Sequence, residues 1–545
     1  MSTELQLPSR PASPEQVAAC NASVAWLRQF VPPHAWQLAP TPHHGNPHIA
    51  QGCVRLCADS RQIQPGDVFF AFPGDVGDGR KYIPAALAAG AQAVLYDDTN
   101  FSWNPDWNVP CCAVTGLKAL AGYIASEHYG HPDADIYTVA VTGTNGKTSC
   151  ALWSGRALAR PNAPSAVMGT LGVGLMHASR AKVEVAFDAT GFTTPDAVLL
   201  QTRLVQMRAA GAQALALEAS SIGLVQGRMH GLHVDAAVFT NLTRDHLDFH
   251  GDMQAYEEAK TLLFLWPGLK VAVINLDDPM GARLIARMQA HAAASGQPLP
   301  QIIGYSVQGA SLPGIAVLQA SHVRSRHAGT EFHLDSPFGS AQIKTHLVGL
   351  FNVSNVLAVL GVLLGRGQAL SVAQEAVEAL TPAPGRMQQL GGQDAPLIVI
   401  DYAHTPDALA KTLDALRPVA QERGGELWCV FGCGGERDPG KRPQMGQIAE
   451  AADHVLVTSD NPRGEDPHSI IEQILAGIGR PVQAIDDRAA AILSAVKHAG
   501  RHDVVLIAGK GHEDYQEIRG KKLPFSDADH AQLALAARVS MKRSA

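Results

Sequence analysis

The chain has 545 residues, of which 46 % are apolar and 17 % are charged, a composition that can bury large cores and is not that of a disordered protein. Because one hydrophobic core rarely grows beyond about 250–300 residues, the length predicts several domains, roughly two to four. The formal net charge is −7 and the sequence has no basic domain or stripe, which argues against nucleic-acid binding.

The first residues, MSTELQLPSRPASPEQ, are polar and lack the apolar core of a signal peptide. The most apolar stretch, residues 353–364, is too short to span a bilayer. The eight cysteines lack the spacing of a zinc site, so we expect reduced thiols. These features predict a cytoplasmic protein without a membrane span, and we expect a monomer.

The amino-terminal third begins with a proline-rich stretch, residues 1–50, that shows little periodicity and predicts a loosely ordered extension. A compact α/β pattern starts at Arg55. Strands are predicted at residues 68–72 (VFFAF) and 91–98 (AQAVLYDD), with a helix at 83–90 between them. The extension and a small first domain together take up residues 1–117.

The second region, residues 118–383, alternates strands with helices. The segment IYTVAVTG predicts a strand that runs into a glycine-containing loop, and a helical stretch follows from Lys147. Further strands are predicted in ALALE (214–218), AAVFTN (236–241) and VAVIN (271–275). Such alternation predicts a mostly parallel sheet covered by helices.

The segment TPAPGRM, residues 381–387, predicts a hinge before a third domain at residues 384–545. Four apolar strands follow it, each running into a polar or glycine-rich loop: LIVIDYA, LWCVFGCGG, HVLVTSD and DVVLIAGKG. Ligands of open α/β sheets bind at the carboxyl ends of the strands, so we expect functional residues in these loops.

The strongest local signal is VTGTNGKTS, residues 141–149. Backbone N–H groups of such a loop can cradle phosphates, Lys147 can reach the β- and γ-phosphates, and the Thr148 hydroxyl can bind Mg²⁺. The strict pattern G-x-x-x-x-G-K-[ST] is broken because Val141 occupies its first glycine position. The strand before the loop and the helix after it favour a phosphate site over a chance turn. The predicted nucleotide-binding residues are Gly143, Thr144, Asn145, Gly146, Lys147, Thr148 and Ser149.

Glu218 ends the predicted strand ALALE, where a carboxylate can hold Mg²⁺ beside the phosphate loop. Taken alone, this residue would serve equally well as a helix-capping acid.

The variant T-G-T-N-G-K-T resembles the loop of the Mur ligases and folylpolyglutamate synthases, and ordered motifs extend the resemblance to the Mur ligase family over roughly residues 55–540. The resemblance implies three α/β domains. They are a small uridine-binding domain, a central P-loop-type ATPase domain with a parallel sheet, and a C-terminal Rossmann-like domain.

The segment FTNLTRDHLDFHGDMQAYEEAK, residues 239–260, resembles the family segment that carries a metal-binding histidine and a carbamylated lysine. Carbamylation turns an ammonium into a carboxylate, which suits Mg²⁺. The resemblance therefore implies a metal set of Thr148, Glu218, His246 and Lys260 as carbamyl-lysine, and a catalytic set of Lys147, Glu218, His246 and Lys260. The motifs GLFNVSN and GRM add Asn352, Asn355 and Arg386 to the nucleotide site.

Four segments resemble those that contact the UDP-muramoyl peptide: ADSRQIQPGDVFFAFPG, DGRKYIPAAL, FTTPD and EASSIGLVQGR. Two positions depart from the family pattern, with Ile222 where many members have histidine and Phe192 where some have a polar residue. The residues implied to bind this substrate are Ala58, Ser60, Asp75, Val76, Gly77, Phe192, Thr193, Thr194, Ser220, Gln226 and Arg228.

The motif DNPR, residues 460–463, resembles the signature of the diaminopimelate-adding members. Diaminopimelate carries a carboxylate that lysine lacks, and an arginine can bind a carboxylate through two parallel hydrogen bonds. Arg463 and Arg437 are the implied clamps, and Glu513 is expected to pair with the distal ammonium. The residues implied for this site are Arg437, Asp460, Asn461, Pro462, Arg463, Gly509 and Glu513.

The resemblance thus implies an ATP- and Mg²⁺-dependent carbon–nitrogen ligase of peptidoglycan precursor synthesis. It would join meso-diaminopimelate to a UDP-linked muramoyl dipeptide through an acyl phosphate. A lysine-adding or folate-glutamylating ligase is one alternative, against which DNPR and the first-domain motifs argue. A non-catalytic nucleotide-binding regulator is the other, against which Lys147, Glu218, His246 and Lys260 argue.

Overall fold

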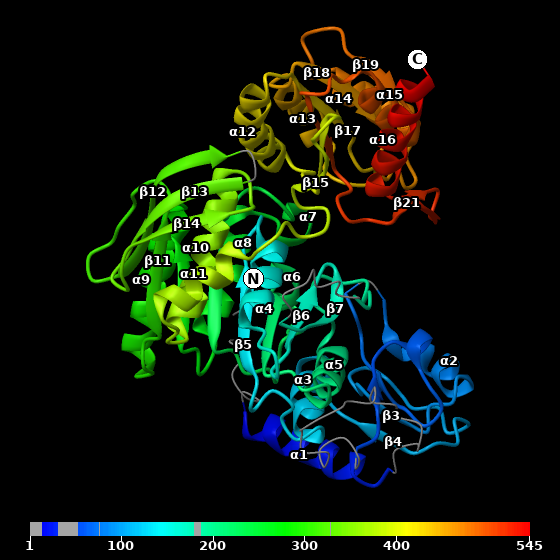
Figure 1. Ribbon diagram of the computed structural model, residues 1–545. Helices are drawn as coiled ribbons and strands as arrows, with labels where there is room; N and C mark the ends of the chain where they lie inside the picture. The colour runs from blue at the N-terminus through cyan, green and yellow to red at the C-terminus, as the bar shows by residue number, and fades with distance from the viewer. Residues whose placement is uncertain (1–12, 31–52, 76, 179–186, 327–328, 545) are drawn as a thin grey trace. The chain divides into compact units, whose positions relative to one another are not determined.

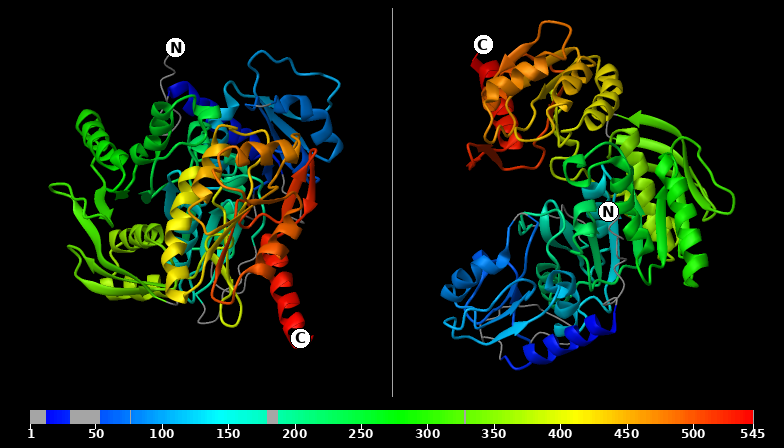
Figure 2. Two further views of the ribbon diagram at one scale, coloured as in Figure 1. Left: turned by 90° about the horizontal axis from the view of Figure 1, so that it is seen from above. Right: turned by 180° about the vertical axis from the view of Figure 1, so that it is seen from behind.

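The computed structural model describes residues 13–30, 53–75, 77–178, 187–326 and 329–544 (Figures 1 and 2). The chain forms two compact units, which are described separately. The first lies within residues 1–242, 249–304 and 361–367, and the second within residues 243–248, 305–360 and 368–545. Among the described residues, no helix is both long and apolar enough to cross a membrane.

The first unit begins with a helix where the sequence predicted a loosely ordered extension. Helix α1 (Pro14–Leu27) starts in a capping box, in which the Ser13 side chain accepts from the backbone of Gln16 and the Gln16 side chain accepts from the backbone of Ser13. Its buried Cys20, Val24 and Leu27 join the core of the first domain. For these residues the prediction of a loosely ordered extension was wrong. The sequence contained the reciprocal capping signal of a helix start, which the prediction did not use.

The first domain is built on a parallel sheet with strand order β1-β2-β3-β4. Along β2, Val68 and Phe70 face the core that contains α1 and α3, whereas Phe69 and Ala71 face the core that contains α2. The predicted strands and helix are confirmed. The elements are β1 (Leu56–Cys57), η1 (Ser60–Gln62), β2 (Val68–Ala71), η2 (Gly79–Tyr82), α2 (Ile83–Ala88), β3 (Ala93–Tyr96), β4 (Cys111–Ala113) and α3 (Leu117–His128).

The central sheet of the first unit has the strand order β11-β10-β9-β5-β8-β6-β7. Strand β5 pairs in parallel with β8 on one side and with β9 on the other. The β9–β10 and β6–β8 pairs are also parallel, whereas β6 and β7 are antiparallel. The prediction of a mostly parallel sheet is therefore confirmed. The strands are β5 (Tyr137–Thr142), β6 (Ser165–Gly169), β7 (Gly172–Met176), β8 (Ala214–Glu218), β9 (Ala236–Phe239), β10 (Val271–Asn275) and β11 (Gln301–Ser306).

Because β5 lies between β8 and β9, its carboxyl end is flanked by theirs. The loop after β5 therefore lies beside Glu218, which ends β8, and beside the loop that follows β9. The helices of this unit are α4 (Lys147–Leu158), α5 (Ala197–Ala209), α6 (Ser221–Val225), α8 (Met253–Thr261), η3 (Leu262–Leu265) and α9 (Pro279–Ser295).

The second unit contains an antiparallel ribbon and a second parallel sheet. Strands β12 (Ala316–Arg326), β13 (Gly329–Asp335) and β14 (Ala341–Thr345) pair in that order. The second sheet has the order β15-β16-β20-β17-β18-β19, with β15–β16 the antiparallel pair. Its strands are β15 (Gln388–Gly391), β16 (Leu397–Asp401), β17 (Leu427–Phe431), β18 (His454–Thr458), β19 (Gln483–Ile485) and β20 (Val504–Ala508).

Helices cover both faces of this second sheet. On β20, Val504 and Leu506 pack in the core that contains α12, α13 and α14, while Val505 and Ile507 pack in the core that contains α15 and α16. Burial of both faces explains why the strands are continuous apolar runs. The helices are α12 (Pro406–Arg423), α13 (Lys441–Ala449), α14 (Pro467–Leu475), α15 (Arg488–His498) and α16 (Asp527–Ser544), the last two side by side in Figures 1 and 2.

Along the chain, two helices follow the antiparallel ribbon and precede the second sheet. They are α10 (Leu350–Gly365), most of which belongs to the second unit, and α11 (Leu370–Glu378). Residues 381–387 form no helix or strand, which agrees with the predicted break, although the role of a hinge stays a prediction. The remaining elements of this unit are α7 (Leu247–His250), whose residues divide between the two units, and the hairpin of β21 (Tyr515–Ile518) and β22 (Lys521–Pro524).

Candidate functional site

The loop after β5 has the form of a phosphate cradle. Gly143 adopts a φ of 146°, and a Cβ at this position would lie 1.8 Å from Thr240 Oγ1, so the close approach of the two loops requires glycine. The next residues are held by Asn241, whose carbonyl accepts from the Thr144 amide at 2.8 Å and whose side chain accepts from the Asn145 amide at 2.9 Å. Val141 at the first glycine position of the strict motif is thus no obstacle, because Gly143 provides the turn.

The amino end of α4 follows this loop directly. Lys147 Nζ donates to the carbonyls of Gly143 and Thr144 at 2.9 and 2.8 Å, so the ammonium is folded over the loop. Thr148 and Ser149 are buried in the first turn of the helix. The backbone N–H groups and the helix dipole at the amino end of a helix favour an anion.

Glu218 lies within hydrogen-bonding distance of this turn. The Thr148 hydroxyl donates to Glu218 Oε2 at 2.9 Å, and the amide of Thr170 donates to Glu218 Oε1 at 2.7 Å. A Cβ at Gly169 would lie 2.2 Å from Glu218 Oε1, so this glycine leaves space for the carboxylate. The structure therefore brings a hydroxyl and a carboxylate together at the carboxyl end of β8, as oxygen ligands of Mg²⁺ require.

Lys260 is 1 % exposed, although an unmodified lysine on a helix is usually solvated. Its Nζ lies 4.1 Å from the centre of the Tyr256 ring, and the Tyr256 hydroxyl lies 3.2 Å from Thr144 Oγ1. Tyr256 thus links α8 to the phosphate loop. A buried lysine beside this loop is compatible with a modified, functional side chain.

His246 belongs to the second unit and has a φ of 53°, in the left-handed region. Its side chain is exposed, and its Nε2 lies 3.5 Å from Asp245 Oδ2. Among the described residues, no three His, Cys, Asp or Glu side chains gather as a metal-binding group. The predicted metal set contains one pair of these residue types, Glu218 and His246, alongside a hydroxyl and a lysine.

The other predicted nucleotide residues also lie in the second unit. Asn352 Nδ2 donates to the carbonyl of Val348 at 2.8 Å, and Asn355 Nδ2 donates to Asn352 Oδ1 at 3.4 Å. The guanidinium carbon of Arg386 lies 4.3 Å from the centre of the Tyr402 ring. Beside Tyr402, burial lowers the pKa of His512 to about 4, and the positive charge of Arg386 adds to this effect.

Most of the residues predicted to bind the UDP-substrate form one connected group in the first unit. Thr194 Oγ1 donates to the carbonyl of Glu218 at 2.7 Å and lies 3.0 Å from Ser220 Oγ. Arg228 donates to the carbonyl of Thr194 at 2.8 Å and to Gln226 Oε1 at 2.7 Å. These contacts join the segment before α5 to the loop after β8.

Asp75 brings the first domain into this group. Its carboxylate accepts from Gln226 Nε2 and, at 2.7 Å, from Lys118 Nζ, so its negative charge is balanced. The Gly77 carbonyl accepts from the Gly74 amide at 2.8 Å in the same turn. Val76 lies outside the described residues.

The remaining members of this set lie nearby or in the first domain. The Thr193 hydroxyl accepts from Thr170 Oγ1 at 3.3 Å, and Thr170 in turn contacts Glu218. Phe192 is 47 % exposed and its ring lies 4.9 Å from the Arg228 guanidinium carbon, so this departure from the family pattern stacks on a predicted substrate residue. Ala58 is partly buried against the first core, and Ser60 begins η1.

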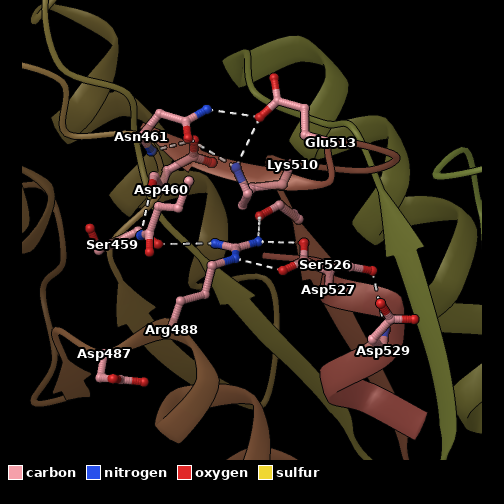
Figure 3. A network of polar contacts seen from close by, with 12 residues as sticks. Ser459, Asp460, Asn461, Asp487, Arg488, Lys510, Glu513, Ser526, Asp527 and Asp529 are labelled. Atoms are coloured by element: carbon pink, nitrogen blue, oxygen red, sulfur yellow. Dashed lines mark hydrogen bonds and ion pairs between the residues drawn. The ribbon is translucent and has the colours of Figure 1, made fainter. Parts of the chain in front are cut away.

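The predicted amino-acid site is a network at the carboxyl ends of β18 and β20 (Figure 3). Asn461 Nδ2 donates to Glu513 Oε2 at 2.8 Å. The fully buried ammonium of Lys510 donates to Asn461 Oδ1 at 3.0 Å and to Glu513 Oε2 at 2.9 Å. Gly509 is required beside this network, because a Cβ there would lie 2.4 Å from Asp460 Oδ2.

The two predicted arginine clamps flank Gly434. A Cβ at this glycine would lie 3.0 Å from Arg463 Nη1 and 3.9 Å from Arg437 Cγ. Arg463 has a φ of 52°, donates through Nη1 to the carbonyl of Gly435 at 2.7 Å, and lies 3.3 Å from Glu517 Oε2. Pro462 packs against Gly435, where a Cβ would lie 2.0 Å from the proline carbonyl oxygen.

Several residues of these sites were missed from the sequence. Asn241, Tyr256 and Lys510 stood inside quoted motifs, but nothing in the motifs indicated their contacts. Thr170 contacts Glu218, and Arg488 contacts Asp527, although the members of each pair lie far apart in the sequence. No local sequence pattern predicts such contacts.

The comparisons with known proteins agree with this architecture. Three family models match: the Mur ligase family catalytic domain at residues 55–129, the Mur ligase middle domain at 141–363, and the Mur ligase glutamate ligase domain at 385–511. The chain is 60 % identical, over 89 % of its length and 95 % of the relative's, to a UDP-N-acetylmuramoyl-L-alanyl-D-glutamate–2,6-diaminopimelate ligase of Janthinobacterium sp. (strain Marseille). The chain belongs to the Mur ligase family.

Two further comparisons extend over almost the whole chain. The ligase of the same name from Ralstonia nicotianae is 50 % identical, over 93 % of this chain and 97 % of that one. A solved structure of a ligase with this name is 36 % identical, covers 92 % of this chain and 98 % of that one, and has a TM-score of 0.61. As a Mur ligase, the chain is a carbon–nitrogen ligase with the three-domain α/β architecture that the sequence predicted. The boundaries at residues 117 and 383 stay predictions.

Proposed function

We propose that this Mur ligase uses ATP to join meso-diaminopimelate to UDP-N-acetylmuramoyl-L-alanyl-D-glutamate in peptidoglycan precursor synthesis. The observation that carries the proposal is the site at the carboxyl ends of β17, β18 and β20, where two arginines flank Gly434 and a carboxylate, Glu513, is held by Asn461 and Lys510. The two arginines match the distal carboxylate of diaminopimelate, and Glu513 matches its distal ammonium. Relatives that carry this activity in their names align with nearly the whole chain.

The reaction has two bond-forming steps. The D-glutamate carboxylate attacks the γ-phosphorus of ATP, the bond between the γ-phosphorus and the bridging oxygen breaks, and ADP leaves. The amine of the amino acid then attacks the acyl phosphate, inorganic phosphate leaves, and the amine loses a proton. Because no covalent bond to the protein is needed, catalysis rests on alignment and on neutralising phosphate charge.

The loop after β5 supplies these effects for the phosphates. Its backbone N–H groups and the amino end of α4 bind anionic oxygens, and the Lys147 ammonium exchanges its loop carbonyls for the transferring phosphoryl group. The residues Gly143 to Ser149 thus form the proposed phosphate site. The resemblance to the family assigns Asn352, Asn355 and Arg386 to nucleotide binding as well.

The described donor set fits Mg²⁺. Thr148 and Glu218 offer a hydroxyl and a carboxylate 2.9 Å apart, and the resemblance to the family adds His246 to the proposed ligands. Bound there, the ion supplies positive charge to the phosphate oxygens. Thr170 holds the Glu218 carboxylate in place through the amide contact at 2.7 Å.

We further propose that Lys260 is carbamylated. Burial disfavours a charged ammonium, whereas a carbamate provides the anionic oxygens that Mg²⁺ prefers. The support is the 1 % exposure of this lysine and its place beside Tyr256, which contacts the phosphate loop.

The experiment that tests the ligase proposal is a phosphate-release assay with four mixtures: ATP alone, ATP with either acceptor substrate, and ATP with both. The ligase predicts sustained release that requires both the UDP-dipeptide and the amino acid. Release that ignores both, or none at all with the full mixture, contradicts the proposal and favours the nucleotide-binding regulator. The cytoplasmic site of action and the monomeric state stay predictions.

A further inference from the structure

Arg488, the first residue of α15, lies completely buried beneath the proposed amino-acid site. Its guanidinium forms a two-point ion pair with Asp527, through Nε at 2.7 Å and Nη2 at 2.8 Å, and neither side chain is exposed to solvent. The same guanidinium donates to the carbonyl of Ser459 at 3.3 Å and to that of Ala508 at 3.0 Å. Figure 3 shows the pair below Asp460 and Lys510.

The carbonyl of Ser459 lies just after β18 and that of Ala508 ends β20, two strands that do not pair with each other. In the sheet, β17 lies between β20 and β18. The β17 ladder ends at Phe431–Val457 on one side and at Val430–Ile507 on the other. Ser459 and Ala508 lie just beyond these last pairs, so the guanidinium makes the connection that the sheet no longer provides.

Each carbonyl immediately precedes a segment of the proposed site. Ser459 is followed by Asp460 and Asn461, and Ala508 by Gly509 and Lys510. A shift of one strand end relative to the other would separate Asn461 from Lys510, whose side chains are 3.0 Å apart. The contact between strand ends therefore sets the geometry of the network above it.

Asp527 ties a third segment to the same point. It begins α16, directly after the β21–β22 hairpin. In this hairpin the backbone amide of Glu517 donates to Asn461 Oδ1 at 2.9 Å, and the carbonyl of Glu517 accepts from the Arg463 amide at 2.9 Å. Three segments that contact the proposed site thus converge on one ion pair.

Only arginine has the geometry for this role. Four of its five N–H donors are used, two on Asp527 and one on each carbonyl, in directions fixed by the planar group. The single ammonium of lysine cannot reach Asp527 and both carbonyls at once, because these acceptors lie in three different directions.

We propose that Arg488, held by Asp527, is a positioning residue for amino-acid selection, which fixes the ends of β18 and β20 so that Asn461, Arg463 and Glu513 meet the incoming amino acid together. The inference rests on the proposed function, because it assigns amino-acid binding to this network. It adds a residue that touches no substrate and acts through two backbone carbonyls.

The test is Arg488→Lys in the full-length enzyme, with initial rates measured separately against each of the three substrates. A 1 Å misplacement of binding groups can cost about a hundredfold, so we expect the KM for the amino acid to rise at least about tenfold. The KM values for ATP and the UDP-dipeptide should stay within about twofold, because the hydrogen bonds of Arg488 go to Asp527, Ser459 and Ala508 and to no residue proposed for those two substrates. The preference for diaminopimelate over L-lysine should fall by a similar factor.

Arg423→Lys is the matched control. Arg423 also holds backbone carbonyls, those of Gly392 at 2.8 Å and Arg501 at 3.0 Å, but at the amino-terminal edge of the same sheet. It should lower thermal stability without changing the KM for the amino acid. If Arg488→Lys does not fold, Asp527→Asn takes its place, because this substitution keeps the side-chain shape, and the same rise in KM is expected.

The inference is overturned if the KM for the amino acid changes no more in folded Arg488→Lys or Asp527→Asn than in Arg423→Lys. The Arg488–Asp527 pair would then have only a structural role. The ligase proposal is judged separately, on the wild-type enzyme. If the wild type prefers another amino acid, the KM for that amino acid is measured instead, so the role of Arg488 is still decided.

Discussion

The proposed phosphate site and the proposed amino-acid site are built in different ways. The phosphate loop takes its shape from backbone conformation, with Gly143 at a φ of 146° and amides held by Asn241. The amino-acid site takes its shape from buried charged side chains, with Lys510 joining Asn461 to Glu513 above the Arg488–Asp527 pair.

This difference corresponds to what each site must recognise. Every ATP-dependent ligase binds the same phosphates of ATP, and main-chain N–H groups with one lysine are enough to bind them. An amino acid is recognised by the positions of its charges, which only placed side chains can match. Substitutions at the first site should therefore lower turnover with any amino acid, whereas substitutions at the second should change which amino acid is used.

The largest effect is expected for Lys147→Ala. Loss of the main protein cation at the transferring phosphoryl group should lower kcat by about a thousandfold or more, with every amino acid alike. Steady-state phosphate release at saturating ATP and Mg²⁺ measures this. Lys270→Ala is the control, because that side chain is 66 % exposed and its ammonium pairs with Asp235. Near-normal turnover of Lys147→Ala would exclude the assignment.

The next largest effect is expected for Lys260→Ala, again independent of the amino acid. If a carbamate at this position supplies anionic oxygens, its loss should lower kcat by about a hundredfold or more, and added short-chain carboxylic acids should restore part of the activity. Lys260→Met, which fills the same buried space, separates loss of the group from a packing defect. A crystal structure with a bound ATP analogue and an unmodified Lys260 remote from any metal would contradict the proposal.

Arg463→Lys should affect selection instead of turnover in general. The charge stays but the two-point contact with a carboxylate is lost, so kcat/KM for diaminopimelate should fall by about ten- to a hundredfold while the KM for ATP is unchanged. Arg519→Lys, on the neighbouring hairpin turn, is the control. An equal loss with diaminopimelate and L-lysine would show that Arg463 does not read the second carboxylate.

The smallest effect concerns stability and pH. The pKa of His512 is lowered to about 4 by burial and by Arg386, so the unfolded state binds more protons between this value and about 6.5. The unfolding free energy should therefore fall as the pH falls through this window. Equilibrium unfolding in urea at pH 7.5 and pH 5 should show a smaller loss for His512→Gln than for wild type. An identical loss of unfolding free energy in the two proteins would show that His512 does not cause the pH dependence.

The two regions also differ in how far the sequence predicts them. The strands at β5, β8 and β10 are apolar runs, and the phosphate loop, its lysine and Glu218 follow each other along a local pattern. The helix α1 was missed although Ser13 and Gln16 stood at capping-box spacing.

The contacts that shape the second region could not be predicted in this way. Arg488 and Asp527 are 39 residues apart, and Lys510 and Asn461 are 49 apart. A charged residue in a sequence is normally taken to be solvated, and only the folded chain shows that these are buried and paired. Lys260 is a similar case, since its burial depends on how α8 packs.

The proposed preference for diaminopimelate is tested most directly by a competition assay. Wild-type enzyme receives equal concentrations of meso-diaminopimelate and L-lysine with one UDP-dipeptide, and the two products are separated and counted. Lysine lacks the second carboxylate, and loss of its contact with the two arginines should cost about 4 kcal/mol, so we predict a preference on the order of a thousandfold for diaminopimelate. Comparable amounts of the two products would contradict the assignment of DNPR to diaminopimelate and would favour the lysine-adding alternative.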